Sequence, residues 1–214
     1  MRFGDRQQAG RRLAARLESF RACDPIVVAL PRGGVPVAAE VAARLHAPLD
    51  VLVVRKIGHP RQPELAVGAL GEDGVVVLDE HSIAQLAVTP EALAVAVARE
   101  RAELERRVVR YRGKRPRQPV AGRTVIVVDD GLATGASAKA AIEVLGRSGA
   151  ARIVLAVPVA PADTCDALAR LADEVVCLST PADFRAVGRW YEKFGQVSDE
   201  EVAALLQAAA AVIT

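Results

Sequence analysis

The stretch Thr124–Ser137 reads TVIVVDDGLATGAS, and it decides the fold. Its first five residues are β-branched and uncharged, which predicts a strand buried on both faces of a parallel sheet. Two acids follow, then a loop of small and hydroxyl-bearing residues, then a segment that predicts a helix over Ser137–Arg147. A site is expected in this loop, because ligands of open α/β sheets bind outside the carboxyl ends of the strands.

The same alternation of strand and helix continues on both sides of this stretch. Leu65–Leu70 and Val75–Leu78 flank the turn Gly71–Gly74, which is a hairpin pattern. We therefore predict an open, doubly wound, mainly parallel α/β sheet with an inserted antiparallel hairpin. The other strands are expected at Ile26–Leu30, Leu49–Val54, Arg152–Val157 and Glu174–Leu178, and the other helices at Asp5–Phe20, Val35–Leu45, Thr89–Arg112, Ala162–Leu171 and Ser198–Ala211.

Length and composition indicate one globular domain over residues 1–214. The chain is 51% hydrophobic and 25% charged, and its 28 basic and 26 acidic residues nearly balance, which disfavours a general nucleic-acid coat. Its three cysteines are widely spaced and form no CxxC pair, which favours a reducing compartment over a disulfide scaffold or zinc site. Met1–Phe20 has no signal-peptide pattern and no apolar run could span a bilayer, so we expect a cytoplasmic protein without a membrane partner.

The residues after the strand at Thr124 have the chemistry to hold a sugar phosphate. Backbone N–H groups at a helix start bind anions, and the hydroxyls of Thr134 and Ser137 add donors. Asp129 and Asp130 would repel a phosphate, but their carboxylates accept hydrogen bonds from vicinal hydroxyls. A ribose 5-phosphate satisfies both halves of the stretch.

The ordered string of a four-residue apolar strand, two acids, three variable residues, Thr-Gly, any residue and Ser is similar to a known signature. It resembles the phosphoribosyl-pyrophosphate (PRPP) motif of type I phosphoribosyltransferases, and the similarity to the family covers about Ile26 to Val159. The whole chain also resembles stand-alone bacterial phosphoribosyltransferase-like proteins. The resemblance implies that Asp129 and Asp130 hold the ribose hydroxyls and that the 5-phosphate binds to Ala133, Thr134, Gly135, Ala136 and Ser137.

The resemblance also implies a reaction and a cofactor. The 5-phosphoribosyl group would pass from PRPP to a nitrogenous base and release pyrophosphate, through a transition state like an oxocarbenium ion. Mg²⁺ would be bound mainly through PRPP, with Asp129 and Asp130 as further possible ligands. Ala133 stands where purine-salvage members often carry a third acid, so the acceptor base stays open.

Two further loops are candidates for the pyrophosphate. Arg32-Gly33-Gly34 follows the first strand, where glycine allows close backbone approach to an anion and Arg32 supplies a bidentate donor. In the family this is the pyrophosphate loop and often holds a cis peptide, so we expect one near Pro31–Gly33, at Pro31–Arg32 or Arg32–Gly33. Arg55–Glu64 reads as a polar loop, and the resemblance implies that Arg55 and Lys56 cover the pyrophosphate, with Arg32 and Lys56 stabilising it as it leaves. No GxGxxG follows the first strand, which disfavours a Rossmann dinucleotide enzyme.

The chain ends are candidates for a small hood over a core of about residues 22–180, made from residues 1–21 and 181–214. Phe184, Trp190, Tyr191 and Phe194 cluster there and are either a stacking wall for the base or a small satellite core. The basic run Arg106–Arg117 is either a solvated helix end or an RNA contact. The RNA alternative describes a PRPP- or nucleotide-sensing regulator with weak or no catalysis, although we expect no nucleic-acid partner. A homodimer, common among relatives, stays open.

Overall fold

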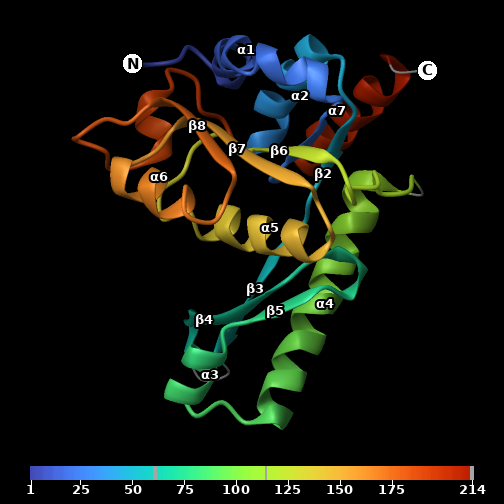
Figure 1. Ribbon diagram of the computed structural model, residues 1–214, viewed down its shortest axis with the longest axis vertical. Helices are drawn as coiled ribbons and strands as arrows, with labels where there is room; N and C mark the ends of the chain where they lie inside the picture. The colour runs from blue at the N-terminus through green and yellow to red at the C-terminus, as the bar shows by residue number, and fades with distance from the viewer. Residues whose placement is uncertain (60–61, 114, 213–214) are drawn as a thin grey trace.

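The computed structural model describes residues 1–59, 62–113 and 115–212, and its core is a five-stranded parallel sheet (Figure 1). The strand order is β2-β1-β6-β7-β8, so the carboxyl ends of β1 and β6 lie side by side. This confirms the predicted open, mainly parallel α/β sheet, although β2 ends at Val51 and not at Val54. The strands are β1 (Ile26–Ala29), β2 (Leu49–Val51), β6 (Thr124–Val128), β7 (Arg152–Val159) and β8 (Glu174–Ser179).

Helices cover both faces of this sheet, because successive side chains of each strand point to opposite sides. Val27 and Ile126 pack into the cluster on one face, and Val28 and Val127 into the cluster on the other. Burial on both sides explains why the strands read as uninterrupted apolar runs. The first face is covered by α1 (Arg6–Arg16), α2 (Gly34–Leu45) and α7 (Asp199–Val212), and the second by α5 (Ala136–Arg147) and α6 (Ala162–Leu168) (Figure 1).

A separate three-stranded antiparallel sheet forms an arm that extends from the core (Figure 1). The predicted hairpin is its β4–β5 pair, but the segment Arg55–Pro63, expected to be a loop, begins with a strand. Ile57 is buried opposite Gly68 and is the one large apolar residue of the strand, whose neighbours Arg55 and Lys56 are charged. Residues 60 and 61 of the expected loop lie outside the described residues. The arm consists of β3 (Arg55–His59), β4 (Gln62–Leu70), β5 (Val76–Leu78), α3 (Glu80–Gln85) and α4 (Pro90–Arg112).

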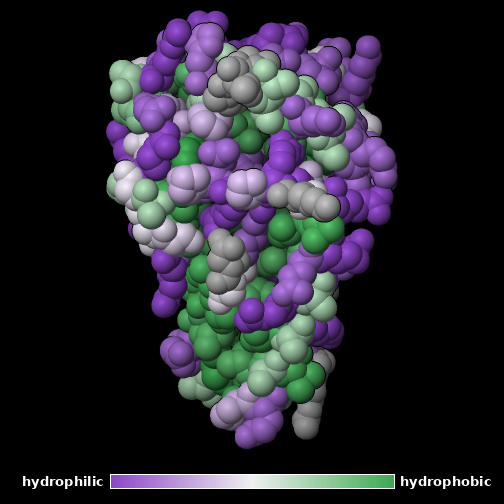
Figure 2. Space-filling model, turned by 90° about the vertical axis from the view of Figure 1, so that its right-hand side faces the viewer, coloured by the Kyte–Doolittle hydropathy of each residue, from purple (hydrophilic) through white to green (hydrophobic). Residues whose placement is uncertain are grey.

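Apolar side chains gather over the lower half of the molecule, where the arm lies (Figure 2). Val76 and Leu78 of β5 pack in part against the main core cluster, whereas Leu65 and Val95 are exposed. Within residues 1–59, 62–113 and 115–212, no helix combines the length and apolar character that a bilayer crossing requires.

A buried ion-pair network joins the arm to the core. Arg112, at the end of α4, donates from Nε to Asp50 at 2.9 Å and from Nη2 to the carbonyl of Val51 at 2.7 Å. It also donates to Glu72, in the turn between β4 and β5, and all three charged residues are buried. Breaking such a pair by removing one partner leaves a buried charge uncompensated. The network therefore fixes the end of α4 against β2.

Arg112 is buried in this network and so departs from the expectation that the basic run Arg106–Arg117 is a solvated helix end or an RNA contact. Arg106 and Arg110 do lie at a solvated helix end, with 59% and 47% of their side chains exposed. Arg106 and Arg107 both donate to Glu103 within their own helix, and Arg110 pairs with Asp199 of α7 at 2.6 Å. Each of these four arginines therefore has an intramolecular ion-pair partner. Lys114 of the run lies outside the described residues.

Candidate active site

The acid pair lies directly at the carboxyl end of β6, as predicted. Asp129 and Asp130 are half-buried, and the backbone N–H of Asp130 donates to the Asp129 carboxylate at 2.8 Å. Burial, and second the neighbouring Asp130 carboxylate, raises the pKa of Asp129 well above the ordinary value. Burial also raises the pKa of Asp130, and a hydrogen bond from Arg6 opposes that rise. The two carboxyls are therefore held in a poorly solvated place where bound hydroxyls would replace water.

Two glycines bring the loop after β1 against these acids. A Cβ on Gly33 would lie 2.0 Å from Oδ2 of Asp130, and one on Gly34 would lie 2.6 Å from the carbonyl oxygen of Val128. The glycines are thus needed for close approach to the acid pair, a reason that the expected contact with an anion did not include. The peptide bond between Pro31 and Arg32 is cis, which confirms the prediction made for this loop.

The loop after the acid pair packs against α6 and leads directly into α5. Gly135 has a φ of +69°, and a Cβ there would lie 2.9 Å from both Leu168 and Thr164. The hydroxyl of Thr164 also donates to the carbonyl of Ala133 at 3.1 Å, which fixes the loop. The exposed residues of this segment are Ala133, Thr134 and Ser137, and Ala136 is half-buried. The first N–H groups of α5 have no partners within their own helix, which suits an anion.

A cationic hollow of about 360 Å³ lies beside the cis peptide. Arg55 and Lys56 of β3 line it together with Ser137, so the structure brings these predicted residues to the two sheet-edge loops. Sequence reasoning missed the contribution of α4, which adds Arg99, Glu100 and Arg107. Glu100 is buried and accepts two hydrogen bonds from Arg55, at 2.9 and 2.6 Å, and two from Arg99, at 3.2 and 3.0 Å. Glu100 therefore holds both guanidinium groups at the wall of the hollow.

A second hollow, of about 520 Å³, is lined by Gly33 and Asp130 and shares no lining residue with the first. Arg6 of α1 lines it and donates from Nε to Oδ2 of Asp130 at 2.8 Å and from Nη1 to the carbonyl of Gly195 at 2.8 Å. Its guanidinium also lies 3.9 Å from the ring centroid of Phe194. Sequence reasoning missed Arg6, since the partner that defines it is 124 positions away. The wall is completed by Arg32, Gly33, Gly195, Gln196 and Val197.

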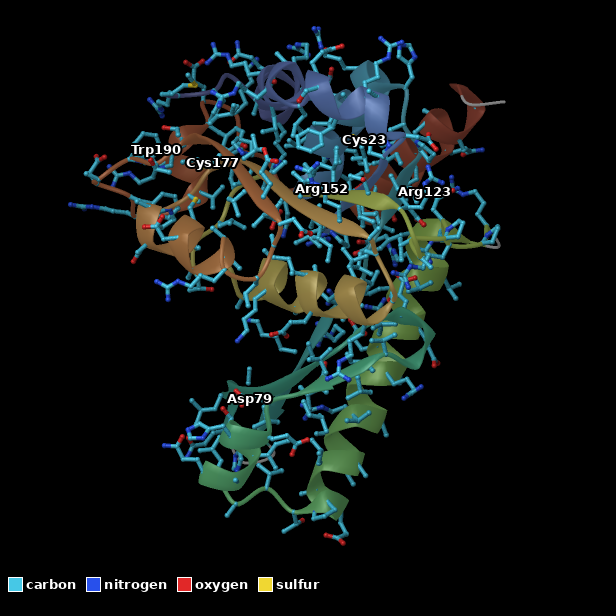
Figure 3. All side chains as sticks on the ribbon, viewed as in Figure 1. Cys23, Asp79, Arg123, Arg152, Cys177 and Trp190 are labelled. Atoms are coloured by element: carbon cyan, nitrogen blue, oxygen red, sulfur yellow. The ribbon has the colours of Figure 1, made fainter. Side chains whose placement is uncertain are left out.

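The aromatic cluster is divided between a small core and this second hollow. Tyr191 is buried beside Phe3, with ring centroids 5.5 Å apart, and its hydroxyl donates to the backbone carbonyl of Asp130 at 2.6 Å. Phe184 and Trp190 are partly buried against the same small core, and Trp190 lies at the rim of the fold, on the side of Cys177 (Figure 3). Of the four aromatics, Phe194 is the one that lines the second hollow, with 38% of its surface exposed.

Comparisons with known proteins agree with this geometry. The family model of the phosphoribosyl transferase domain matches residues 5–192. A Mycobacterium tuberculosis protein whose name provisionally describes it as a phosphoribosyl transferase is 53% identical over 207 residues, which are 97% of this chain and 47% of that protein. The chain thus spans about half the length of the curated relatives it matches. The crystal structure of TT1426 from Thermus thermophilus has a TM-score of 0.90 and 48% identity, over 97% of this chain and 99% of that one.

Proposed function

Because the chain belongs to the phosphoribosyltransferase family, we propose that it transfers the 5-phosphoribosyl group of PRPP to a nitrogen of a nucleobase-like acceptor. One observation carries the proposal. The backbone of Gly33 and Gly34 is pressed against Asp129 and Asp130, so the loops after β1 and β6 form one continuous edge. The cationic hollow is lined by Pro31 and Ser137 of these two loops, and the second hollow is lined by Gly33 and Asp130.

The sugar phosphate would occupy the middle of this edge. Asp129 and Asp130 would accept the ribose hydroxyls, and their negative charge would also stabilise the cationic character that the ribose ring gains in the transition state. The loop from Ala133 to Ser137 would bind the 5-phosphate with the N–H groups at the start of α5. The reaction breaks the C1–O bond to pyrophosphate as the acceptor nitrogen bonds to C1, so the protein mainly has to hold and neutralise these groups.

The cationic hollow would receive the departing pyrophosphate. Pro31 of the loop after β1 lines it, Lys56 and Arg55 come from the arm, and Glu100 holds Arg55 in place. Arg32 follows Pro31 directly and is exposed enough to move, with 39% of its side chain accessible and Asp199 at 3.6 Å. These basic side chains, with the backbone of the glycine loop, are the groups that we expect to bind pyrophosphate.

The donor set fits a magnesium ion that arrives with its substrate. Mg²⁺ binds to proteins through one or two carboxylates together with phosphate oxygens and water. Asp129 and Asp130 supply that number of carboxylates, and the described residues contain no cluster of three or more potential metal ligands. These two residues would therefore hold the ion together with PRPP oxygens. When bound, the ion would neutralise charge on the leaving pyrophosphate.

The two chain ends meet as the proposed hood over the core. The backbone N–H of Phe3 donates to the carbonyl of Trp190 at 2.8 Å, and that of Glu192 donates to the carbonyl of Phe3 at 2.8 Å. This pairing supports our proposal of a single domain over residues 1–214, with its core at about 22–180 and its hood from 1–21 and 181–214.

Calorimetry and a pyrophosphate-release assay test the proposed function. PRPP with Mg²⁺ should bind to the wild type, and at least one base should support pyrophosphate release. Asp130→Asn should weaken PRPP binding about tenfold to a hundredfold, because hydrogen bonds to a charged group are lost. Asp24→Asn is the matched control, since Asp24 is exposed and pairs with Arg123, and these two residues precede β1 and β6 and so lie at the opposite edge of the sheet from the site. Absence of PRPP binding would overturn the proposal, and binding without turnover on any base would leave a nucleotide-binding regulator.

A further inference from the structure

The hollow beside Arg6 has a polar character that restricts what can bind there. Two of its lining side chains are guanidinium groups, Arg6 and Arg32, which donate hydrogen bonds and accept none. Its one carboxylate, Asp130, already accepts from Arg6 and faces the proposed sugar site. The amide of Gln196 is the one neutral polar side chain of the wall. The hollow therefore offers mainly donors and positive charge.

Arg6 is held so that one of its three nitrogens remains for a ligand. Its Nε and Nη1 are used by Asp130 and by the carbonyl of Gly195, each at 2.8 Å. One face of the guanidinium is stacked on Phe194, and 11% of the side chain is exposed. Among the described residues, Nη2 of Arg6 has no hydrogen-bond partner. A guanidinium fixed by two bonds and a ring presents its third nitrogen with little loss of conformational freedom.

Nη2 of Arg6 lies on the side of the proposed acceptor and not on the side of the proposed pyrophosphate site. Arg6 touches the same Asp130 that would hold the ribose and lines the second hollow with Arg32, whereas Arg55 and Lys56 line the first. Arg32 is 39% exposed and would turn toward the pyrophosphate, which leaves Arg6 as the guanidinium beside the acceptor. A flat ring that entered beside Phe194 would meet Arg6 at its edge. A ring edge carrying an oxygen would accept from Arg6, whereas an amino group there would set donor against donor and leave both unsatisfied.

On the basis of the proposed function, we propose that the acceptor is a base with a carbonyl or carboxylate oxygen, and that Arg6 recognises this oxygen. In this arrangement Arg6 is a specificity-determining residue that also positions Asp130. Amino-substituted rings such as adenine and cytosine are then poor acceptors, because their exocyclic donor faces the guanidinium.

Product binding tests this inference without requiring turnover. Calorimetry is run on the wild type with two matched pairs of 5′-monophosphates, inosine against adenosine and uridine against cytidine. Each pair differs mainly in a carbonyl replaced by an amino group. Ribose 5-phosphate is measured alongside, to isolate the contribution of the sugar phosphate. The carbonyl member should bind about tenfold to a hundredfold more tightly, the range for a hydrogen bond to a charged group. A preference within one pair alone supports the inference for that ring size.

Arg6→Gln then assigns the preference to this residue. In this variant the ratio of affinities within a pair should fall toward one. A fall in affinity that the nucleotides share with ribose 5-phosphate would instead reflect the loss of the contact between Arg6 and Asp130. Arg12→Gln is the matched control on the same helix, because Arg12 lies 5.8 Å from the Phe3 ring and does not line the hollow. If Arg6→Gln does not fold, Arg6→Lys keeps the charge and the comparison of ligands on the wild type still decides.

The outcomes distinguish failure of the inference about Arg6 from failure of the proposed function. Ribose 5-phosphate that binds, together with equal or tighter binding of the amino nucleotides, overturns the inference and leaves the proposed function standing. An equal loss of preference in the Arg6 and Arg12 variants also overturns it. Failure of ribose 5-phosphate and of PRPP to bind overturns both.

Discussion

The proposed sugar side of the candidate site comes from one short stretch of chain, whereas the proposed acceptor side is assembled from segments far apart in sequence. Thr124–Ser137 supplies the strand, the acid pair and the proposed phosphate loop in order. On the acceptor side, the bond from Arg6 to the carbonyl of Gly195 spans 189 positions. A stretch whose strand, turn and helix each favour the same local geometry needs few distant contacts. The acceptor side depends on the small core around Phe3 and Tyr191, so the two sides should respond differently to mutation.

The largest effect is expected where the loop after β1 meets the acid pair. In Gly33→Ala the new Cβ would lie 2.0 Å from an Asp130 oxygen that Arg6 also holds, so the carboxylate and the loop must separate. A displacement of about 1 Å in a positioned group costs about a hundredfold. Calorimetry should therefore show PRPP affinity reduced by about a hundredfold.

A glycine with open space around it gives the control for this experiment. Gly146, in α5, has nothing within 4 Å of an added Cβ among the described residues. Gly146→Ala should leave PRPP binding unchanged and raise the free energy of unfolding by about 0.5–1 kcal/mol, because alanine loses less backbone entropy in a helix. Equal PRPP affinity in the Gly33 and Gly146 variants would mean that the close approach does not serve ligand binding.

A second prediction concerns the charge at the end of β6. Burial raises the pKa of Asp129 above its ordinary value of 3.8, so the folded protein keeps this proton to higher pH than the unfolded chain does. Stability is then lost as pH rises from the ordinary carboxyl range through the raised pKa. Asp129→Asn cannot ionise, so thermal or denaturant unfolding at neutral pH should show a gain above the ~0.5 kcal/mol spread of neutral surface substitutions.

The stability gain of Asp129→Asn should disappear at a pH below the ordinary carboxyl range, where the wild-type residue is protonated in both states. The same variant should bind ribose 5-phosphate about tenfold to a hundredfold more weakly. Asp24→Asn, at an exposed position, should change neither quantity. A gain that persists unchanged in acid would contradict the assignment of the effect to this carboxyl.

The sequence alone was sufficient to predict those helices and strands that a short run of neighbouring residues determines. The bounds of β6 and the span of α4, expected over Thr89–Arg112, agree with prediction, because an apolar run and a Thr-Pro-Glu start are local patterns. β3 was missed because Ile57 is its one large apolar residue, so the segment has no apolar alternation that would predict a strand. Arg6 could not be distinguished from Arg11 or Arg12, since helix phase against a distant strand decides which arginine reaches Asp130.

The burial of two charged residues of α4 could have been predicted from their spacing in the sequence. Glu100 lies four residues before the buried Leu104, and Arg112 lies eight after it, so both fall on the buried stripe of the helix. The many basic residues around Arg112 made its position on the buried stripe hard to recognise. A charge on an apolar stripe is therefore better interpreted first as one half of a buried pair and only then as part of a surface patch.

The smallest expected effect probes the contact where the two sides meet. Tyr191→Phe removes the hydroxyl that donates to the Asp130 carbonyl at 2.6 Å and leaves the packing against Phe3 in place. The free energy of unfolding should fall by about 1 kcal/mol, because a buried hydrogen bond is lost. Burial raises the pKa of Tyr191, so the hydroxyl stays neutral and the difference from wild type should be flat through neutral and mildly alkaline pH. If the sugar side is locally determined, ribose 5-phosphate affinity should change by no more than about twofold, within the ~0.5 kcal/mol of neutral substitutions. A tenfold loss would instead show that the chain ends hold the acid pair in place, and the distinction between the two sides would fail.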